Sequence, residues 1–526
     1  MRLAGSLRGF LDLGVRELVD NPAGMSFRWS LAAMTRVLAV AAMALLAAAV
    51  FLAVAGSVAA RAGSSSVPIL AVAGDGTACS TPPACGDGGA ATAAELSFPE
   101  GVALGRGGDL YVADWGDNEV RTVSPGGTIH AVAGDGTPCA RAPACGDGDA
   151  GTAAELSFPE GVAVDRAGNV YIADTGDNEI RKVSPSGTIT RFAGTGVECS
   201  QPPACGDGGP ATAAQLSAPA GVAVDQAGDV YVADSGDQEI REISRSGRIR
   251  RVAGVGTPCE SAPSCGDRGP ATSAQLSFPG GVAVDQKGDV YVADSGDNEV
   301  RMVAPSGTIT VVAGDGTACS GPPSCGDGGE AGDAELSGPD GVAVDSAGNV
   351  FVADSGDNEV RRVSVSGEIA TVAGQGSSCA QPPSCGDTGP ATSAQLDYPD
   401  AVTADPQGDV YLADTFDQGI RWLPAGSAVT IQAGALRLVL SAFGATVART
   451  TVTVRYALSG AAAVTLSVRG AGRLAVVAHA AGRAGFGQLV WNRRLDGVPA
   501  ARGRYTLTVT ATVGGHSGAT ALRVRL

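Results

Sequence analysis

Two sets of residues in this 526-residue sequence have types and spacings that could do chemistry: paired cysteines and recurring carboxylates. The 12 cysteines form pairs with five residues between the partners, and the pairs recur with a period of 60 residues. The pairs are Cys79 and Cys85, Cys139 and Cys145, Cys199 and Cys205, Cys259 and Cys265, Cys319 and Cys325, and Cys379 and Cys385. Only three histidines occur, so chemistry that needs several imidazoles is nearly excluded.

Each cysteine pair could be a metal site or a local disulfide. The spacing does not match the usual zinc knuckle, and no His or third Cys recurs nearby. The sequence therefore predicts six disulfides, no bound metal and no cofactor, with export from the cytoplasm supplying the oxidising environment.

A second candidate site breaks the symmetry of the repeats. The segments LSFPE, LSFPE, LSAPA, LSFPG, LSGPD and LDYPD precede the recurring GVAVD-like strings. They place carboxylates at four of six equivalent positions, Glu100, Glu160, Asp340 and Asp400. Trp115 and Phe416 replace small residues in a recurring DSGDN turn, and Phe98 and Tyr398 precede a proline. These eight residues are predicted to bind a ligand, either a sugar, a cationic group or a protein. The alternative is drift in terminal repeats, or packing beneath the long loops.

Other charged residues recur in every repeat and are better explained by architecture. One Asp ends the second strand of each repeat, and one Arg follows seven residues later, as in Asp114 and Arg121. We expect the Asp to accept backbone N–H groups in a turn and the Arg to pair with such carboxylates. Calcium bound to the acidic loops is the functional alternative, although no twelve-residue EF-hand pattern occurs.

Both sets must be positioned by the repeat itself. The string GVAVDQKGDVYVADSGDNEVR at 281–301 recurs near 161–181, 221–241 and 341–361, with weaker copies from Gly101 and Ala401. Each unit holds four short runs rich in β-branched residues, separated by Gly, Asp, Asn and Pro turns, which predicts a four-stranded meander. A single such sheet cannot bury both faces, whereas six arranged radially can, and closing the ring protects the edges.

The repeat resembles the NHL family of β-propellers. The shared pattern is a proline, a GVAVD-like strand, a Gly-Asn or Gly-Asp turn, a YVAD-like strand and an Asn-x-x-Arg segment. Many NHL repeats have His after that Asn, where this chain has Glu119, Glu179, Glu239, Glu299, Glu359 or Gly419. The stretch AGDG…GDGGPATAAQL resembles the subtype found in teneurins and exported bacterial propellers. The resemblance implies an all-β, six-bladed propeller over residues 67–434. Because the fourth-strand motif occurs seven times, we predict that residues 67–73 close the ring; residues 428–433 are the alternative.

The periodicity stops after Gly434 and the composition changes. Residues 435–526 alternate apolar and polar residues, which predicts a small β-sandwich. The segment 491–511 resembles the immunoglobulin-like domain of the flagellar hook-capping protein, through Trp491, Asp496, Gly497, Gly503 and Tyr505. Residues 67–434 carry a net charge of −32 and residues 435–526 one of +11. The basic domain could dock on the acidic propeller or on anionic wall polymers, or it could simply be solvated.

The N-terminus predicts a membrane segment. Residues 37–60 contain no charge and, as a helix of about 36 Å, would span the bilayer core. Arg28 and Arg36 precede the segment, so residues 1–36 are predicted to be cytoplasmic and everything after Arg61 extracellular. The alternative is a cleaved signal peptide, favoured if translation starts at Met25, and the protein would then be secreted.

These features predict an exported, membrane-anchored scaffold that presents a rigid face to an extracellular protein or glycan. Nucleic acid is excluded as a partner because the acidic region repels phosphate. The alternative is a metal-dependent hydrolase or lyase that uses Glu100, Glu160, Asp340 and Asp400. The propeller region contains a single, unrepeated His130, so an imidazole-based site is disfavoured.

Overall fold

The computed structural model describes residues 67–526, apart from short breaks. The breaks are residues 84, 141, 143–144, 203–204, 260–264, 323–324, 381, 383–384, 407, 426–428, 434–435, 448–450, 459–460, 471–472, 483–484, 496–497 and 514–515. Within this described part, regular structure consists of β-strands and single-turn 3₁₀ helices. No helix among these residues is long and apolar enough to cross a membrane, and the predicted membrane segment 37–60 lies outside them.

Residues 68–423 form repeated four-stranded antiparallel sheets, as expected for an NHL propeller, and each sheet is called a blade below. The first two blades are β2 (Pro99–Leu104), β3 (Leu110–Asp114), β4 (Glu119–Val123) and β5 (Ile129–Ala133), then β6 (Pro159–Val164), β7 (Val170–Asp174), β8 (Glu179–Val183) and β9 (Ile189–Ala193). The next two are β10 (Pro219–Val224), β11 (Val230–Asp234), β12 (Glu239–Ile243) and β13 (Ile249–Ala253), then β14 (Pro279–Val284), β15 (Val290–Asp294), β16 (Glu299–Val303) and β17 (Ile309–Ala313). The fifth is β18 (Pro339–Val344), β19 (Val350–Asp354), β20 (Glu359–Val363) and β21 (Ile369–Ala373).

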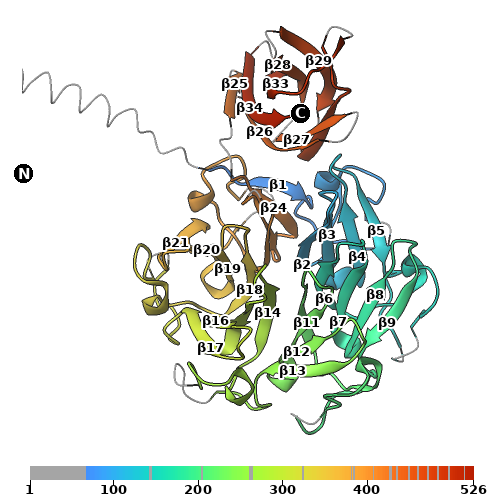
Figure 1. The fold of residues 1–526 in the computed structure, drawn as a ribbon, viewed down its shortest axis with the longest axis vertical. Coiled ribbons are helices and arrows are strands. Elements are labelled where there is room, and N and C mark those ends of the chain that lie inside the picture. Colours follow the sequence, from blue (N-terminus) through green and yellow to red (C-terminus); the bar gives the residue numbers. More distant parts are fainter. Residues whose placement is uncertain are drawn as a thin grey trace, which may run out of the picture. The chain divides into compact units, whose positions relative to one another are not determined.

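The remaining blade joins the two ends of the repeat region. Its order is β1 (Leu70–Ala73), β24 (Gly419–Leu423), β23 (Val410–Asp414) and β22 (Pro399–Ala404). The pairing of β1 with β24 confirms that residues 67–73 supply the closing strand. The first strands of successive blades pack against one another, and β2 packs against both β6 and β22 (Figure 1).

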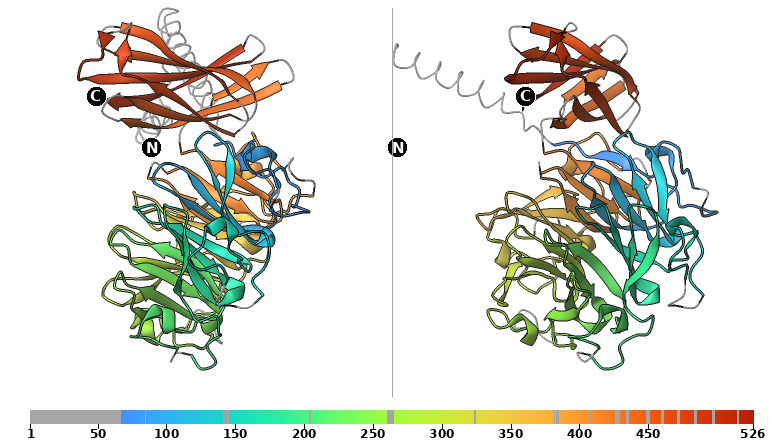
Figure 2. Two further views of the ribbon diagram at one scale, coloured as in Figure 1. Left: turned by 90° about the vertical axis from the view of Figure 1, so that its right-hand side faces the viewer. Right: turned by 45° about the vertical axis from the view of Figure 1, so that its right-hand side comes forward.

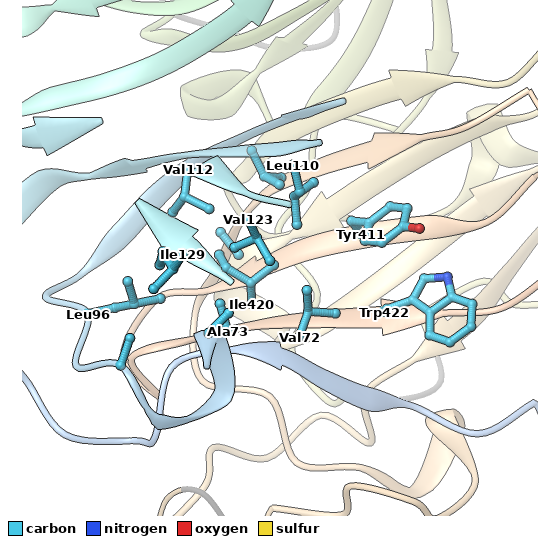
Figure 3. Close-up of a cluster of buried hydrophobic side chains, with 14 of the residues drawn as sticks. Val72, Ala73, Leu96, Leu110, Val112, Val123, Ile129, Tyr411, Ile420 and Trp422 are labelled. Carbon is cyan, nitrogen blue, oxygen red and sulfur yellow. The ribbon is translucent and has the colours of Figure 1, made fainter. Parts of the chain in front are cut away.

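Buried side chains between neighbouring blades hold the ring together. A hydrophobic cluster joins Val72, Ile420 and Trp422 of the last blade to Leu110 and Val123 of the first (Figure 3). The other blade interfaces carry equivalent clusters of Val, Ile, Leu and Ala. Burial of apolar surface at every interface therefore makes each blade depend on its two neighbours.

Two types of 3₁₀ turn recur between the strands. The first type lies in the loop that leads from the outermost strand of one blade to the next blade. These turns are η1 (Ala91–Ala93), η3 (Gly151–Ala153), η5 (Ala211–Ala213), η7 (Ala271–Ser273), η9 (Ala331–Asp333) and η11 (Ala391–Ser393). The turns between the second and third strands are η2 (Trp115–Asp117), η4 (Thr175–Asp177), η6 (Ser235–Asp237), η8 (Ser295–Asp297) and η10 (Ser355–Asp357).

The C-terminal region contains two further four-stranded sheets that share a hydrophobic core. One is β25 (Val429–Ala433), β26 (Leu436–Val447), β27 (Val452–Leu458) and β30 (Gly485–Trp491). The other is β29 (Arg473–Gly482), β28 (Ala462–Gly470), β33 (Arg504–Val513) and β34 (His516–Arg525). A short pair, β31 (Arg494–Leu495) and β32 (Val498–Pro499), completes the C-terminal region. Figure 2 shows the strands of this region in orange to red.

The spare fourth-strand motif belongs to this C-terminal region, because β25 pairs with β26. Trp491 and Tyr505 are buried there with ring centroids 5.4 Å apart. The Trp491 indole N–H donates to the Arg494 carbonyl at 2.7 Å and the Tyr505 hydroxyl to the Ala501 carbonyl at 2.8 Å. Asp496 and Gly497 lie outside the described residues. The immunoglobulin-like identity of this region remains a prediction.

Candidate functional site

The turn between the second and third strands of each blade connects it to the next blade. In the first blade, η2 ends at Asn118, which adopts a left-handed conformation with φ 53°. Its side-chain oxygen accepts the backbone N–H of Phe158 in the second blade at 3.0 Å. Equivalent bonds follow around the propeller, and the bond from the Phe98 N–H to Gln418 at 2.7 Å links the first blade to the last. The recurring Asn or Gln is therefore a connector between blades.

These bonds hold the residue before each first strand at positive φ. The residues are Phe98 at 51°, Phe158 at 52°, Ala218 at 45°, Phe278 at 49°, Gly338 at 54° and Tyr398 at 56°. Bulky residues rarely adopt this conformation. Aromatic side chains occupy four of the six positions, and those of Phe158, Phe278 and Tyr398 are exposed.

The predicted aromatic residues lie in one cluster that spans the first and last blades. Phe98 contacts Trp115 and Phe416 edge-on, with centroids 6.3 and 5.9 Å apart, and Tyr398 stacks on Phe416 at 5.3 Å. Phe158 extends the cluster, since its ring lies 4.8 Å from that of Trp115. Sequence reasoning missed Phe158, although the repeated LSFPE string was the signal that could have identified it.

The predicted carboxylates line a single cavity of about 300 Å³ formed by the first strands of the blades. Glu100, Glu160, Asp340 and Asp400 all line it, and so does Tyr398. Tyr398 therefore joins the cavity to the aromatic cluster. We call the four carboxylates, Tyr398, Phe98, Trp115, Phe158 and Phe416 the mouth.

Glycines set the width of this cavity. A Cβ on Gly101 would lie 2.1 Å from the Glu160 carbonyl oxygen, and one on Gly161 2.2 Å from that of Ala220. The first strands therefore approach backbone to backbone, and the GVAVD-like motif needs its glycine for this reason.

The electrostatics of the mouth favour a cationic ligand. No Lys or Arg is among the residues that line the cavity, and none of the four carboxylates takes part in a described ion pair. Burial, together with the charges of Glu160, Asp400 and Asp340, raises the pKa of Glu100 to about 10. Burial and the charge of Asp340 raise the pKa of Glu160 to about 7, and burial raises the pKa of Asp400 well above its usual value. A bound cation would relieve this repulsion.

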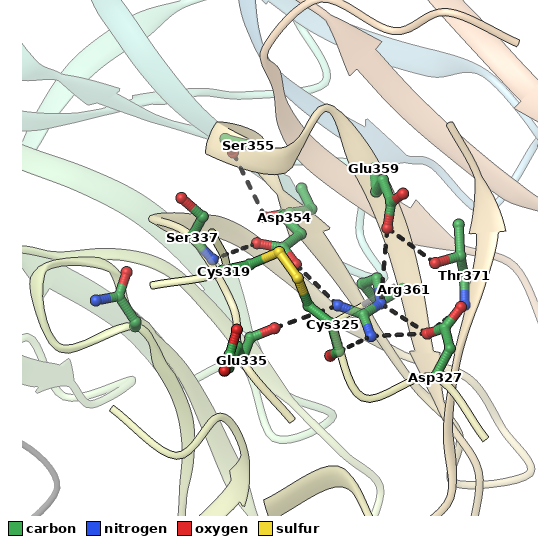
Figure 4. Close-up of polar contacts among 12 residues, drawn as sticks. Cys319, Cys325, Asp327, Glu335, Ser337, Asp354, Ser355, Glu359, Arg361 and Thr371 are labelled. Carbon is green, nitrogen blue, oxygen red and sulfur yellow. Dashed lines mark hydrogen bonds and ion pairs between the residues drawn. A yellow bond between two sulfur atoms is a disulfide. The ribbon is translucent and has the colours of Figure 1, made fainter. Parts of the chain in front are cut away.

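Each blade also contains a buried arginine that fastens the long loop preceding it. In the fifth blade, Arg361 donates to Asp354 at 3.2 Å, to Asp327 at 2.7 Å and to the Cys325 carbonyl at 3.1 Å (Figure 4). Arg121, Arg181, Arg241, Arg301 and Arg421 make the equivalent contacts. The Asp at the end of the second strand also accepts a backbone N–H, as Asp114 does from Ser97 at 2.7 Å. Both architectural predictions are confirmed.

All six predicted cysteine pairs are disulfides, with Cα–Cα distances of 5.5–5.7 Å. In several blades a carboxylate lies close to the two sulfurs, such as Glu95 beside Cys79 and Cys85. Because the sulfurs are bonded to each other, they are not available as thiolate ligands. Calcium binding by the acidic loops remains a prediction.

Comparison with known proteins identifies the repeat. The family model "Teneurin NHL domain" matches residues 58–143, 128–204, 191–257, 248–324 and 304–385, which together cover more than half of the chain. Human teneurin-1 is 31% identical over 252 residues, covering 45% of this chain and 9% of that protein. Zebrafish teneurin-3 is 29% identical over 366 residues, covering 64% of this chain and 12% of that protein. The chain thus spans only about a tenth of the length of these relatives.

Solved structures show weaker similarity. A protein of unknown function from Bacteroides thetaiotaomicron has a TM-score of 0.46 and 17% identity, with 68% of this chain and 75% of that chain covered. Virginiamycin B lyase from Staphylococcus aureus has a TM-score of 0.36 and 15% identity, with 68% and 93% covered. At these TM-scores neither likeness bears on function.

Proposed function

Because the chain belongs to the teneurin NHL domain family, we propose that it is a protein-binding scaffold in which a six-bladed propeller presents a rigid face to an extracellular ligand. The observation that carries this proposal is the mouth, where four carboxylates without a described counter-ion adjoin an exposed aromatic cluster. Rigid aromatic groups beside charged groups are typical of binding hot spots.

Export is part of the proposal. Six disulfides are typical of proteins that fold outside the reducing cytosol. We propose that residues 37–60 anchor the chain in the membrane with the propeller outside; if they are cleaved as a signal peptide, the protein is secreted.

The chemistry of the mouth favours a protein segment that presents a lysine or arginine. The carboxylates attract the charged head group, and the aromatic rings can hold it by cation–π contact and cover its apolar stem. A glycan is the alternative ligand, since aromatic rings and carboxylates also suit sugar rings and hydroxyl groups.

A binding measurement tests the proposal. The immobilised full-length chain is exposed to flexible peptides that carry one Lys, one Arg or one acetyl-lysine, and in parallel to a glycan array. We expect the Lys and Arg peptides to bind, the binding to weaken with salt, and the acetyl-lysine peptide to lose it.

The variants Glu160→Gln and Trp115→Ser should abolish this binding, whereas Asp225→Asn, which changes an Asp outside the mouth, should leave it unchanged. Binding of glycans but not peptides would establish the alternative ligand. Failure of both probe sets, or equal binding by the variants and the parent, would overturn the assignment of the mouth.

The second candidate function is a metal-dependent hydrolase or lyase, because four carboxylates line one cavity. Metal analysis of the purified protein separates the two functions. A stoichiometric transition metal that is lost in Glu160→Gln would favour the enzyme over the scaffold.

We also propose that residues 435–526 form an immunoglobulin-like domain whose charge of +11 lets it dock on the acidic propeller. Cross-linking at low salt with a reagent that joins carboxyl groups to arginine side chains, followed by mass spectrometry, tests this contact. Cross-links confined to within each domain would contradict it.

A further inference from the structure

Each blade contains a carboxylate whose buried oxygen accepts no described hydrogen bond. It is the last residue of the turn between the second and third strands, Asp117 in the first blade. Asp117 is 1% exposed, and neither of its carboxylate oxygens accepts a described hydrogen bond. One oxygen is likewise unpartnered in each of Asp177, Asp237, Asp297, Asp357 and Asp417. An ionised carboxylate left buried in this way would be costly, so the arrangement calls for a neutralising partner.

In three blades a second buried carboxyl group lies beside this carboxylate. Asp117 lies within hydrogen-bonding reach of Asp114, Asp297 of Asp294, and Asp417 of Asp414. Asp114, Asp294 and Asp414 are fully buried. Two carboxyl groups can form a hydrogen bond only when one of them carries a proton.

The charged groups around these pairs do not supply the missing positive charge. In the first blade, Arg121 and Glu119 face the pair from β4, and Asp87 and Glu95 face it from the preceding loop. Arg121 donates to Asp87 at 2.6 Å, to Asp114 at 3.3 Å and to two backbone carbonyls.

The surroundings of the other two pairs are similar. Arg301, Asp267 and Glu299 surround the pair of Asp294 and Asp297. Arg421, Asp387 and Asp397 surround the pair of Asp414 and Asp417, where Arg421 reaches Asp417 only at 3.9 Å. Each guanidinium is therefore shared among several carboxylates.

We propose that each of the pairs Asp114–Asp117, Asp294–Asp297 and Asp414–Asp417 holds one proton between its carboxyl groups, so that mild acid stabilises the propeller. The proton comes from solvent, and the pair then carries one negative charge. The inference does not depend on what the mouth binds.

These pairs lie at turns that carry contacts between blades. The turn that Asp117 ends carries Trp115, and Asp417 follows Phe416, so two of the turns hold aromatic residues of the mouth. The turn ended by Asp297 begins at Ser295, whose hydroxyl donates to the Pro339 carbonyl of the next blade at 2.8 Å. Loss of the proton should therefore loosen the turns that position the mouth and join the blades.

The direction of the pH effect follows from the burial of the pairs. Burial and the charge of the partner raise the pKa of Asp114, and burial raises that of Asp117. A carboxyl whose pKa is higher in the folded chain than in the unfolded chain takes up a proton on folding. Its stabilising effect is complete below the ordinary pKa of Asp and is lost as the pH rises through the folded-state value.

Counting the protons taken up on folding tests the proposal site by site. The folded and denaturant-unfolded full-length chain is titrated near neutral pH, for the parent and for the triple variant Asp117→Asn, Asp297→Asn and Asp417→Asn. An Asn amide can donate the hydrogen bond that the proton provides. We therefore expect the triple variant to take up about three fewer protons than the parent, one for each pair.

The matched control is Asp75→Asn, Asp135→Asn and Asp315→Asn. These three aspartates lie in the loops that follow β1, β5 and β17, where each accepts a Thr N–H at 2.9 Å. The control changes the charge by the same amount, and we expect its proton uptake to equal that of the parent. Unchanged uptake in the first triple variant would overturn the proposal, as would a stoichiometric metal ion retained at these pairs.

A second measurement covers the case in which the triple variant does not fold. Carbon-13 labelling of the aspartate carboxyls in the parent protein shows which of them are protonated. Signals from Asp340 and Asp400 of the mouth are identified with the variants Asp340→Asn and Asp400→Asn. We expect each of the three pairs to hold one shared proton at neutral pH, and a fully ionised set of paired aspartates would overturn the proposal.

Discussion

The buried arginine of each blade uses the particular shape of its side chain. A guanidinium is planar and offers five N–H donors in a fixed fork, so it can satisfy two carboxylates and two carbonyls at once. Arg241, for example, bonds to Asp234, Asp207 and the carbonyls of Gln215 and Cys205. A lysine could not make this set of contacts, which explains why the repeat has Arg there in every copy.

Replacing Arg241 with Met should destabilise the propeller strongly. Because the buried Asp234 would lose its counter-ion, we expect the free energy of unfolding to fall by about 3–5 kcal/mol in urea denaturation. Arg250→Met is the control, since the Arg250 side chain is 62% exposed, and it should cost less than about 1 kcal/mol. Similar losses in the free energy of unfolding for both variants would contradict the stabilising role of the buried Arg241 guanidinium.

The connector Asn178 can be dissected with two substitutions. Its side chain accepts the Ala218 N–H at 2.8 Å while its own φ is 55°. Asn178→Gly removes only the hydrogen bond, so the free energy of unfolding should fall by about 1 kcal/mol. Asn178→Ala should lower it by about 1–2 kcal/mol more, because Ala resists positive φ. Chemical denaturation of both variants measures the difference, and equal costs would show that the backbone conformation is not the constraint.

At the scale of elements, the ring depends on a strand that comes from far away in the sequence. β1 completes the sheet of β22, β23 and β24 and covers Ile420 and Trp422. Without β1 the edge of β24 would be exposed, and an exposed strand edge invites association with other chains.

A single truncation in β1 should therefore weaken the whole propeller. Leu70 is 2% exposed, and Leu70→Ala should lower the free energy of unfolding by about 2–5 kcal/mol through lost burial and a cavity. Val67→Ala serves as the control, because Val67 is 40% exposed and precedes the strand. Thermal or urea unfolding measures both variants, and equal losses in the free energy of unfolding would argue against closure by β1.

The disulfides act on the loops more than on the sheets. The double variant Cys139→Ser and Cys145→Ser opens a seven-residue loop, which in the loop-entropy model costs about 2 kcal/mol. Arg181 should still hold this loop through the Cys145 carbonyl and Asp147. We therefore expect a smaller loss than for the arginine variant, with the native protein showing no thiols reactive toward iodoacetamide.

At the scale of the whole molecule, the mouth exists only because the blades form a ring. Glu100 and Glu160 come from the first two blades, and Asp340 and Asp400 from the last two. They line one cavity because β2 packs against both β6 and β22. Mutual repulsion there opposes stability, which is the usual cost of a preformed binding site.

The variant Glu100→Gln should reveal the repulsion among the carboxylates of the mouth as a pH-dependent difference in melting temperature. The pKa of Glu100 is about 10 in the folded protein, which is higher than in the unfolded chain. As the pH rises above the ordinary pKa of Glu, the unfolded chain ionises first, so the free energy of unfolding falls increasingly. The variant should melt close to the parent in acid and above it in mild alkali, while binding cationic peptides less well. A constant difference in melting temperature across the pH range would refute this account.

The 60-residue period, the four strands of each unit, the disulfide pairs and the pairing of Arg with Asp could all be read from the sequence. These features repeat in register, and they depend on turns, alternation and short separations along the chain. Phe158 was missed because its contact with Trp115 crosses from one blade to the next. Likewise, the motif of β25 resembles a fourth strand, and only pairing with β26 assigns it to the C-terminal sheets.

By itself, then, the sequence determined the repeating blade, because each blade is specified by local turn chemistry and by alternation of apolar residues. Only the tertiary structure decided which strand closes the ring, which carboxylates face one another in the mouth, and which aspartates are buried in pairs. Those outcomes depend on residues more than 300 positions apart, such as Leu70 and Trp422 or Phe98 and Gln418, whose contacts exist only once the ring has closed.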